Sequence, residues 1–344
     1  MPTAGRRIRS ITGRGLRTEP GRVTGSAQAL ARRLGHAAVV VALAYTATFL
    51  IIHVLPGDPI SNMLLNPDNG FSQADIAPII AHYGLDRPVP EQLWMAFSRF
   101  VVGDFGISLR SNLPVSHLMG SAVASTAVLS AAALAVALLV AFALAFGTQN
   151  LPRHFGQGLL RALPSFTLSV PGFIIGIWLI QLFAFRLGLV HITDPDSPAA
   201  TLFAAIALGV PAAAQMAEVL IASLDHEAGQ DYFALARARG LGRTALFFRH
   251  QLKTSAIPVV TMLALTIGEL LGGSLITESI FGRKGIGSLV QSAVANQDFP
   301  VLQAVVSLAA VVFVAVNLVA DLVQPLLDPR LRRPAARALP EGDA

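Results

Sequence analysis

The chain has 344 residues, of which 53% are hydrophobic and only 13% charged, and it contains no cysteine. Soluble domains carry about 25% charged residues, so this composition argues against an ordinary cytosolic enzyme. The lack of cysteine excludes disulfides, a cysteine nucleophile and thiolate metal sites, and a net charge of +5 does not indicate a nucleic-acid partner.

Six predominantly apolar runs are each long enough to cross a bilayer as a helix, which takes about 20 residues. They are Ala37–Leu55, Leu118–Phe146, Ala162–Phe185, Ala199–Ala217 (extending to about Ala222), Ser255–Ile280 and Phe299–Val323. Six such runs leave little room for the alternative that they are buried core helices of a soluble protein. The sequence therefore predicts an all-α integral membrane protein with six transmembrane helices.

The basic residues predict the orientation of these helices. If the N-terminal end is cytoplasmic, 19 of the 25 lysines and arginines lie on the inner side. Because inner loops of membrane proteins are enriched in Lys and Arg, we expect both termini to be cytoplasmic. The chain is thus predicted to be a multi-pass membrane protein.

The N-terminal half is predicted to contain a tail, an anchor and a long outer loop. Residues 1–36 are typical of a disordered basic cytoplasmic tail that contacts anionic membrane lipid. Residues 37–55 are predicted to stay as the first transmembrane helix, because no small-residue signal cleavage site ends the run. Residues 56–116 form the extracytoplasmic loop, which either contacts an external partner or caps the helices.

The remaining chain is predicted to form a five-helix core, residues 117–326, followed by a cytoplasmic tail, residues 327–344. An inner loop, residues 223–254, interrupts this core. It contains two short amphipathic pieces, Gln230–Arg239 and Arg243–Lys253, separated by Gly240-Leu241-Gly242. This pattern predicts a helix on the membrane surface that ends at a glycine and docks a cytosolic partner.

The same loop carries a family resemblance. Its residues are Asp231-Tyr232-Phe233-Ala234-Leu235-Ala236-Arg237-Ala238-Arg239-Gly240-Leu241, then Arg249-His250-Gln251-Leu252 and Ile257-Pro258-Val259-Val260-Thr261. They resemble the cytoplasmic "EAA" loop of binding-protein-dependent ABC importer permeases, in the variant of the oligopeptide, dipeptide and nickel permeases.

Further motifs similar to those of the family follow one another over about residues 37–332. They are Leu55-Pro56-Gly57-Asp58-Pro59, Gly84-Leu85-Asp86-Arg87-Pro88, Gly103-Asp104-Phe105-Gly106, Ser169-Val170-Pro171, Leu271-Gly272-Gly273, Thr277-Glu278 with Phe281, and Asp328-Pro329-Arg330. One turn departs from the family pattern: Phe281-Gly282-Arg283-Lys284-Gly285-Ile286-Gly287 has a lysine where the family has proline. We expect both of its cations to face outward.

The resemblance implies a type I ABC importer permease fold and a set of partners. These are a second homologous permease, two cytoplasmic ATP-binding cassette subunits and an extracytoplasmic substrate-binding protein. The implied substrates are di- and oligopeptides, with nickel or opine-like metal chelates as the alternative. The loop residues implied to contact the ATPase are Asp231, Tyr232, Ala236, Arg237, Ala238, Arg239, Gly240, Leu241, Arg249, His250 and Pro258.

No catalytic constellation is present in the sequence. Neither lysine completes a P-loop, which requires Gly-x-x-x-x-Gly-Lys-(Ser/Thr), so we expect ATP and Mg²⁺ to bind separate ATPase subunits. The histidines lack the spacing that would place two metal ligands on one helix face. We therefore predict a non-catalytic subunit that binds no cofactor or metal.

Polar residues inside apolar runs are candidates for a translocation pathway, because ionisable groups are costly in a bilayer. Glu269 lies half-way along the fifth run, while Gln215 and Glu218 share a face near the inner end of the fourth. Glu269 is either a pathway residue or a buried carboxylate paired with a neighbouring helix or with the partner permease. Glu218 is either a pathway residue or a group at the cytoplasmic boundary. A self-sufficient secondary transporter or channel is the rival function, but it predicts several deep carboxylates.

Overall fold

The computed structural model describes residues 22–54, 76, 80–81, 84, 86–152, 156–189 and 194–327. Over these ranges the protein consists of helices joined by turns and short loops, with one isolated bridge between Ile107 and Pro114. The main helices are α1 (Arg22–Val54), α4 (Val89–Val101), α5 (Val115–Asn150), α6 (Gln157–Leu168), α7 (Gly172–Leu179), α8 (Pro198–Ala228), α9 (Asp231–Ala238), α10 (Arg243–Leu246), α11 (Leu252–Phe281), α12 (Ile286–Ala295) and α13 (Phe299–Leu327).

Five helices are long and apolar enough to cross a membrane, and they overlap five of the six predicted runs. The spans are Ala31–His53, Val115–Asn150, Pro198–Ala228, Pro258–Phe281 and Phe299–Val323. The helix α1 begins at Arg22, so residues 22–36 are helical and not part of the disordered tail that was predicted for residues 1–36. The fourth run was predicted to end between Ala217 and Ala222, but α8 continues to Ala228. The all-α membrane fold is therefore confirmed.

The third run, Ala162–Phe185, is not the single helix that was predicted. It divides into α6 and α7, bent by 98°, and α7 continues as a π-helical segment, η2 (Ile180–Arg186). The break falls at Pro171, which directly precedes α7. Proline has no N–H to donate and disfavours the helical conformation of the residue before it. Among the described residues, six spans are reached only if this bent pair counts as one.

The core of the protein lies between α5 and α8. Alanines on α5 (Ala133, Ala137 and Ala141) are buried there against a row of small residues on α8. A Cβ at Gly209 of α8 would lie 2.5 Å from the carbonyl oxygen of Ala133. Small residues allow membrane helices to approach this closely, which gains van der Waals contact where the hydrophobic effect is weak.

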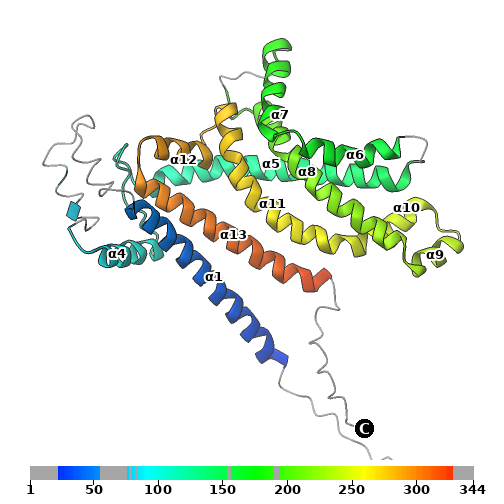
Figure 1. Ribbon diagram of the computed structural model, residues 1–344, viewed down its shortest axis with the longest axis horizontal. Helices are drawn as coiled ribbons and strands as arrows, with labels where there is room; N and C mark the ends of the chain where they lie inside the picture. Colours follow the sequence, from blue (N-terminus) through cyan, green and yellow to red (C-terminus); the bar gives the residue numbers. More distant parts are fainter. Residues whose placement is uncertain are drawn as a thin grey trace, which may run out of the picture.

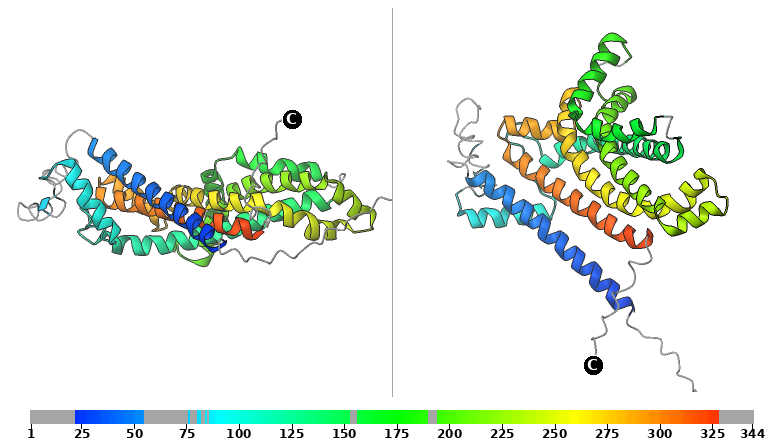
Figure 2. Two further views of the ribbon diagram at one scale, coloured as in Figure 1. Left: turned by 90° about the horizontal axis from the view of Figure 1, so that it is seen from below. Right: turned by 45° about the vertical axis from the view of Figure 1, so that its right-hand side comes forward.

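The surface elements separate to opposite ends of the molecule (Figure 1). The helices α9 and α10 lie at one end, and α4 and α12 lie at the other, an arrangement that Figure 2 also shows. On one flank α1 packs beside α13, where the amide of Gln303 donates to the carbonyl of Tyr45 at 2.9 Å. The described part of the predicted outer loop, which contains α4, is thus far from the predicted inner loop, which contains α9 and α10.

Candidate functional site: a surface helix and a central cavity

The segment predicted to dock a partner is helical, as α9, and presents most of its side chains to solvent. Tyr232 and Leu235 are 43% and 56% exposed, whereas Ala236 is buried and anchors the helix. Arg237 and Arg239 are exposed at its C-terminal end. An exposed apolar surface beside fixed positive charge is suited to binding another protein.

The helix ends at a left-handed glycine, as the sequence predicts. Gly240 has a φ of +85°, and its N–H donates to the carbonyl of Arg237 at 3.0 Å. At its other end, the Tyr232 hydroxyl donates to the carboxylate of Glu227 in α8. Partial burial and the hydrogen bond to Glu227 raise the pKa of Tyr232. The contact between Tyr232 and Glu227 therefore joins the first turn of α9 to α8.

The segment after α9 is anchored in the core by aromatic side chains. Phe247 is fully buried, with its ring 5.8 Å from that of Phe142 and 5.2 Å from that of Phe146, both on α5. The buried Gln251 amide donates to the carbonyl of Leu224 in α8 at 3.3 Å. The surface loop is therefore packed directly against the two central helices.

The remaining predicted loop residues lie on a helical segment that leads without a break into the membrane helix α11. The second amphipathic piece begins as α10, passes through a π-helical segment, η3 (Phe247–Gln251), and runs directly into α11. Arg249 is exposed and His250 is half-buried on η3. Pro258 lies inside α11 and is also exposed.

A polar cluster ties three helices together close to this end. Arg161 of α6 makes two hydrogen bonds to the Asp225 carboxylate of α8, at 2.6 and 2.9 Å. The amide of Gln149 on α5 donates to the same carboxylate at 2.8 Å. Because the ion pair is more than a third exposed, solvent screens it, and its main effect is to orient the helices.

A cavity of about 350 Å³ lies among α7, α8 and α11. Glu269 and Gln215 both line it, together with Pro171, Gly273 and Thr277. Glu269 is exposed in the isolated chain, on a helix that is otherwise apolar enough to cross the membrane. The structure thus brings two of the three predicted pathway residues to one opening.

Glu218, the third predicted pathway residue, is not among the residues that line this cavity. Its carboxylate accepts a hydrogen bond from the Ser165 hydroxyl of α6 at 2.7 Å. The face that Glu218 shares with Gln215 on α8 therefore meets two different environments.

Sequence reasoning assigned no role to Glu278, although it noted the Thr277-Glu278 pair. The side chain is 0% exposed, and its carboxylate accepts from the Thr126 hydroxyl of α5 at 2.6 Å. It also accepts from the N–H groups of Gly287 and Ser288, at 2.7 and 3.2 Å, in the first turn of α12. A carboxylate at a helix N-terminus is favoured by the exposed N–H groups and the helix dipole.

The expectation that Arg283 faces outward is wrong. The side chain is only 3% exposed and donates to the Pro195 carbonyl and the Thr201 hydroxyl, both at 2.7 Å. It also lies 3.3 Å from the carboxylate of Asp196 and 3.3 Å from the hydroxyl of Ser125. Arginine can supply several donors in a fixed plane, and four oxygens meet them here. Lys284 does face outward.

Comparison with known proteins identifies related chains. Residues 137–333 match the model of the binding-protein-dependent transport system inner membrane component family. The chain is similar to the glutathione transport system permease proteins GsiC of Shigella flexneri serotype 5b and Escherichia coli K12, each 33% identical over 83% of this chain and 92% of the relative. The corresponding protein of Salmonella paratyphi A is 32% identical over the same shares.

Proposed function

Because the chain belongs to the binding-protein-dependent transport system inner membrane components, we propose that it forms half of a translocation pathway for peptides. The chain is a multi-pass inner-membrane permease of an ABC importer. This membership decides against the rival secondary transporter or channel. The second permease chain, the two ATPase subunits and the external binding protein are proposed as its partners.

The observation that carries the proposal is the exposed helix α9, joined to α8 at its first turn and followed by a segment that Phe247 anchors against α5. In the proposed mechanism an ATPase subunit binds α9 through Tyr232, Leu235 and Arg237. ATP and Mg²⁺ belong to that subunit. When two ATPase subunits close, α9 moves, and the packing of Phe247 passes this movement to α5 and α8.

We assign the cavity lined by Glu269 and Gln215 to the translocation pathway. Placing a carboxylate on a helix face that contacts lipid costs free energy. The exposed face that carries Glu269 is therefore more suited to line a pathway or to contact a partner permease. The bend at Pro171 places the first turn of α7 at this cavity, so a change in the bend would alter its width. In this proposal the carboxylate of Glu269 meets the positively charged amino group of a peptide.

Substrate identity can be tested by uptake in cells that lack the chain. The relatives are named as glutathione permeases, and glutathione is a small peptide. We expect deletion of this chain to abolish uptake of labelled di- or tripeptides and the intact gene to restore it. Unchanged peptide uptake together with lost nickel uptake would instead favour the metal alternative.

The proposed topology predicts opposite labelling of two exposed arginines. A cysteine at Arg110, between α4 and α5, should react with an impermeant maleimide in spheroplasts. A cysteine at Arg243, at the start of α10, should react only after the membrane is permeabilised. The chain has no cysteine of its own, so the background is low. If only Arg243→Cys were labelled in sealed spheroplasts, the predicted topology would be contradicted and the opposite orientation supported.

A Glu269→Gln variant is expected to lower uptake of cationic peptides by about tenfold while neutral peptides still pass. Gln keeps the shape and the hydrogen-bonding capacity but removes the negative charge, and losing one ionic contact of about 1.4 kcal/mol changes affinity tenfold. Uptake of paired cationic and neutral peptides, measured beside recovery of the assembled complex, tests this.

Glu218→Gln is the matched control, because its carboxylate contacts Ser165 rather than the cavity. It should affect both peptide classes equally or not at all. Equal uptake of both classes by Glu269→Gln at normal complex levels would contradict a role for the charge.

A further inference from the structure

One helical arm projects from the molecule next to the central cavity. The arm consists of α7 and η2, residues 172–186, and both Figure 1 and Figure 2 show it extending away from the bundle. One face of the arm packs on α8. Near its start an added Cβ at Gly172 would lie 3.1 Å from Pro211, and near its end the ring of Phe183 lies 4.5 Å from that of Phe203. The contacts with α8 therefore fix the side of the arm that faces the bundle.

The other side of the arm is exposed and mainly apolar. Residues four apart form one stripe along a helix, and here the stripe consists of Phe173, Ile177, Gln181 and Phe185. All four side chains are exposed, Ile177 by 49% and Phe185 by 69%, and so is the neighbouring Trp178. These four residues, the arm stripe, form an apolar surface with one amide near its middle.

The arm stripe begins at the cavity assigned above to the pathway. Phe173 lines this cavity, and so do Ile276 and Glu269 of α11. All three side chains are exposed in the isolated chain. The cavity is therefore open on the side next to the arm stripe, and the two form one continuous surface.

Two polar side chains on this surface are poorly suited to contact lipid. Glu269 lies in the middle of the span Pro258–Phe281, and Gln181 lies in the bent helix pair that together reaches spanning length. A carboxylate or an amide that faces hydrocarbon without a partner costs free energy. Another protein can offer hydrogen-bonding groups to both side chains, whereas lipid tails cannot.

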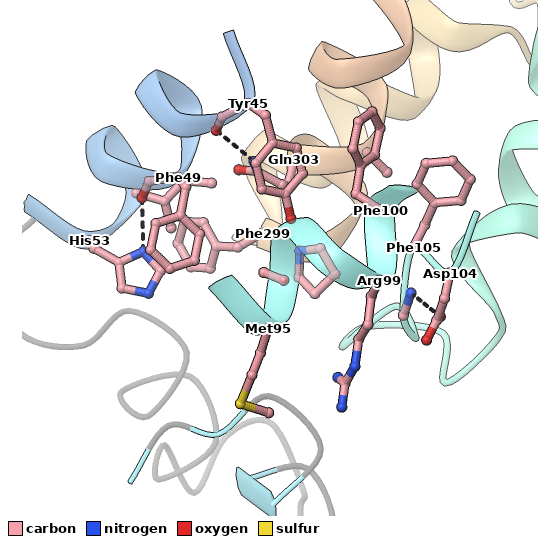
Figure 3. A pocket seen from close by; sticks show the side chains of 15 residues that line it. Tyr45, Phe49, His53, Met95, Arg99, Phe100, Asp104, Phe105, Phe299 and Gln303 are labelled. Carbon is pink, nitrogen blue, oxygen red and sulfur yellow. Dashed lines mark hydrogen bonds between the residues drawn. The ribbon is translucent and has the colours of Figure 1, made fainter. Parts of the chain in front are cut away.

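The flank formed by α1, on the other side of the molecule, has a different character. Its aromatic side chains point inward: Tyr45 is buried, with its ring 4.9 Å from that of Phe100 in α4 (Figure 3). The residues that α1 exposes between positions 38 and 52 are all apolar, among them Leu43 and Ile51. Such a surface suits lipid tails, so the polar groups on the arm side distinguish it as a surface for protein.

We propose that the arm stripe and the open side of the cavity together form the interface with the second permease chain of the importer. This inference rests on the proposed function, since a pathway between two permeases requires the second chain where the cavity is open. A homologous chain carries an equivalent arm, so a two-fold pairing buries both arm stripes at once. In this assembly the amide of Gln181 forms a hydrogen bond across the interface, as polar side chains do between membrane helices.

A photoreactive amino acid tests the interface directly. Benzoylphenylalanine replaces Ile177 in the arm stripe or, as the matched control, Leu43, an exposed aliphatic residue of α1. Membranes of cells that express the complete importer are irradiated, and the products are identified by mass spectrometry. We expect the probe at position 177 to join the chain to a permease, and the probe at position 43 to give lipid adducts. Lipid adducts alone at position 177, or equal permease yields at both positions, would overturn the proposal.

A Gln181→Leu variant separates a protein neighbour from a lipid neighbour. Leucine is favourable in lipid, so an arm that faces lipid tolerates the change. At a protein interface the lost hydrogen bond should reduce the amount of second permease recovered with the tagged chain several-fold. Recovery at or above the level of the unmodified chain would contradict the interface.

Added bulk at the two probe positions gives a matched pair. Ile177→Trp enlarges a side chain inside the proposed contact and should lower recovery of the second permease about tenfold, because a closed interface cannot accept the ring without strain. Leu43→Trp adds similar bulk on α1 and should keep recovery within about twofold. Both positions are exposed in the isolated chain, and size-exclusion chromatography checks that each variant folds. Equal effects of the two variants would count against the arm as the interface.

The proposed function is tested separately in the same cells. Peptide uptake and recovery of the ATPase measure it through α9 rather than through the arm. Normal uptake with only lipid adducts at position 177 would refute the arm interface and leave the proposed function intact. If the unmodified chain supports neither uptake nor recovery of the ATPase, the proposed function fails and this inference fails with it.

Discussion

A Gly240→Val variant is expected to insert into the membrane normally but to lose most substrate uptake. Gly240 has a φ of +85°, and a side chain in the left-handed region costs roughly 1–2 kcal/mol. No atom lies within 4 Å of an added Cβ, so the cost is conformational rather than steric. The chain relieves it by shifting the last turn of α9, which carries Arg237. A loss of about 1.4 kcal/mol lowers ATPase affinity about tenfold.

Two variants separate backbone conformation from side-chain size. Gly242 lies two residues further on, has a φ of −69° and a ψ of 159°, and also has open space around an added Cβ. Gly242→Val should therefore retain uptake. Gly240→Asn should retain more than Gly240→Val, because asparagine tolerates the left-handed region. Pull-down of the ATPase and the ratio of ATP hydrolysis to uptake in proteoliposomes measure the effect. Normal uptake by Gly240→Val would contradict the proposal that α9 couples the ATPase to transport.

A Gly287→Ala variant is expected to prevent accumulation of the folded chain. The added Cβ would lie 2.2 Å from Cα of Leu275 in α11 and 2.9 Å from the Glu278 carboxylate. Because one obstacle is backbone, it cannot rotate aside, so α12 must move and the bonds from Gly287 and Ser288 to Glu278 break. Overpacking and a buried carboxylate without its donors together cost about 3 kcal/mol or more.

The matched control for this variant is Gly272→Ala, in the middle of α11, where no atom lies within 4 Å of an added Cβ. Alanine is a better helix former than glycine by about 1 kcal/mol, so this variant should accumulate at least normally. Fluorescence-detected size-exclusion chromatography of detergent extracts compares the two. A monodisperse Gly287→Ala protein at normal yield would show that the contact between α11 and α12 is not required.

Much of the fold follows from apolar length alone. Five spans coincide with runs of low charge, because a bilayer-crossing helix must satisfy its backbone internally and present apolar side chains. A kink at Pro171 follows from the proline itself, but a bend as large as 98° could not be predicted from the sequence. Hydropathy summed along residues 162–185 is the same for one straight helix and for two bent pieces. The 98° angle depends on the packing of α6 and α7 against α8, which is not local information.

In the candidate site, too, local features could be predicted from the sequence and tertiary contacts could not. The left-handed Gly240 and the exposed Arg237 could be predicted, because the ending of a helix and its charge are local properties. The burial of Arg283 could not, since its acceptors are on α5, α8 and the segment before α8. Likewise, the spacing of Gln215 and Glu218 places both on one face of α8. The tertiary structure then directs one to the cavity and the other to Ser165.

The contacts of Arg283 can form only late in synthesis, because all of its partners precede it in the chain. The guanidinium joins Ser125, Pro195 and Thr201, which precede it by 158, 88 and 82 residues. At about 5–20 residues per second, Ser125 leaves the ribosome roughly 10–30 s before the arginine that binds it. Until then this end of α5 lacks both Arg283 and the α12 backbone that bonds to Thr126. A nascent chain stalled before residue 283 should therefore contain the paired α5 and α8 but leave this end of α5 open to protease.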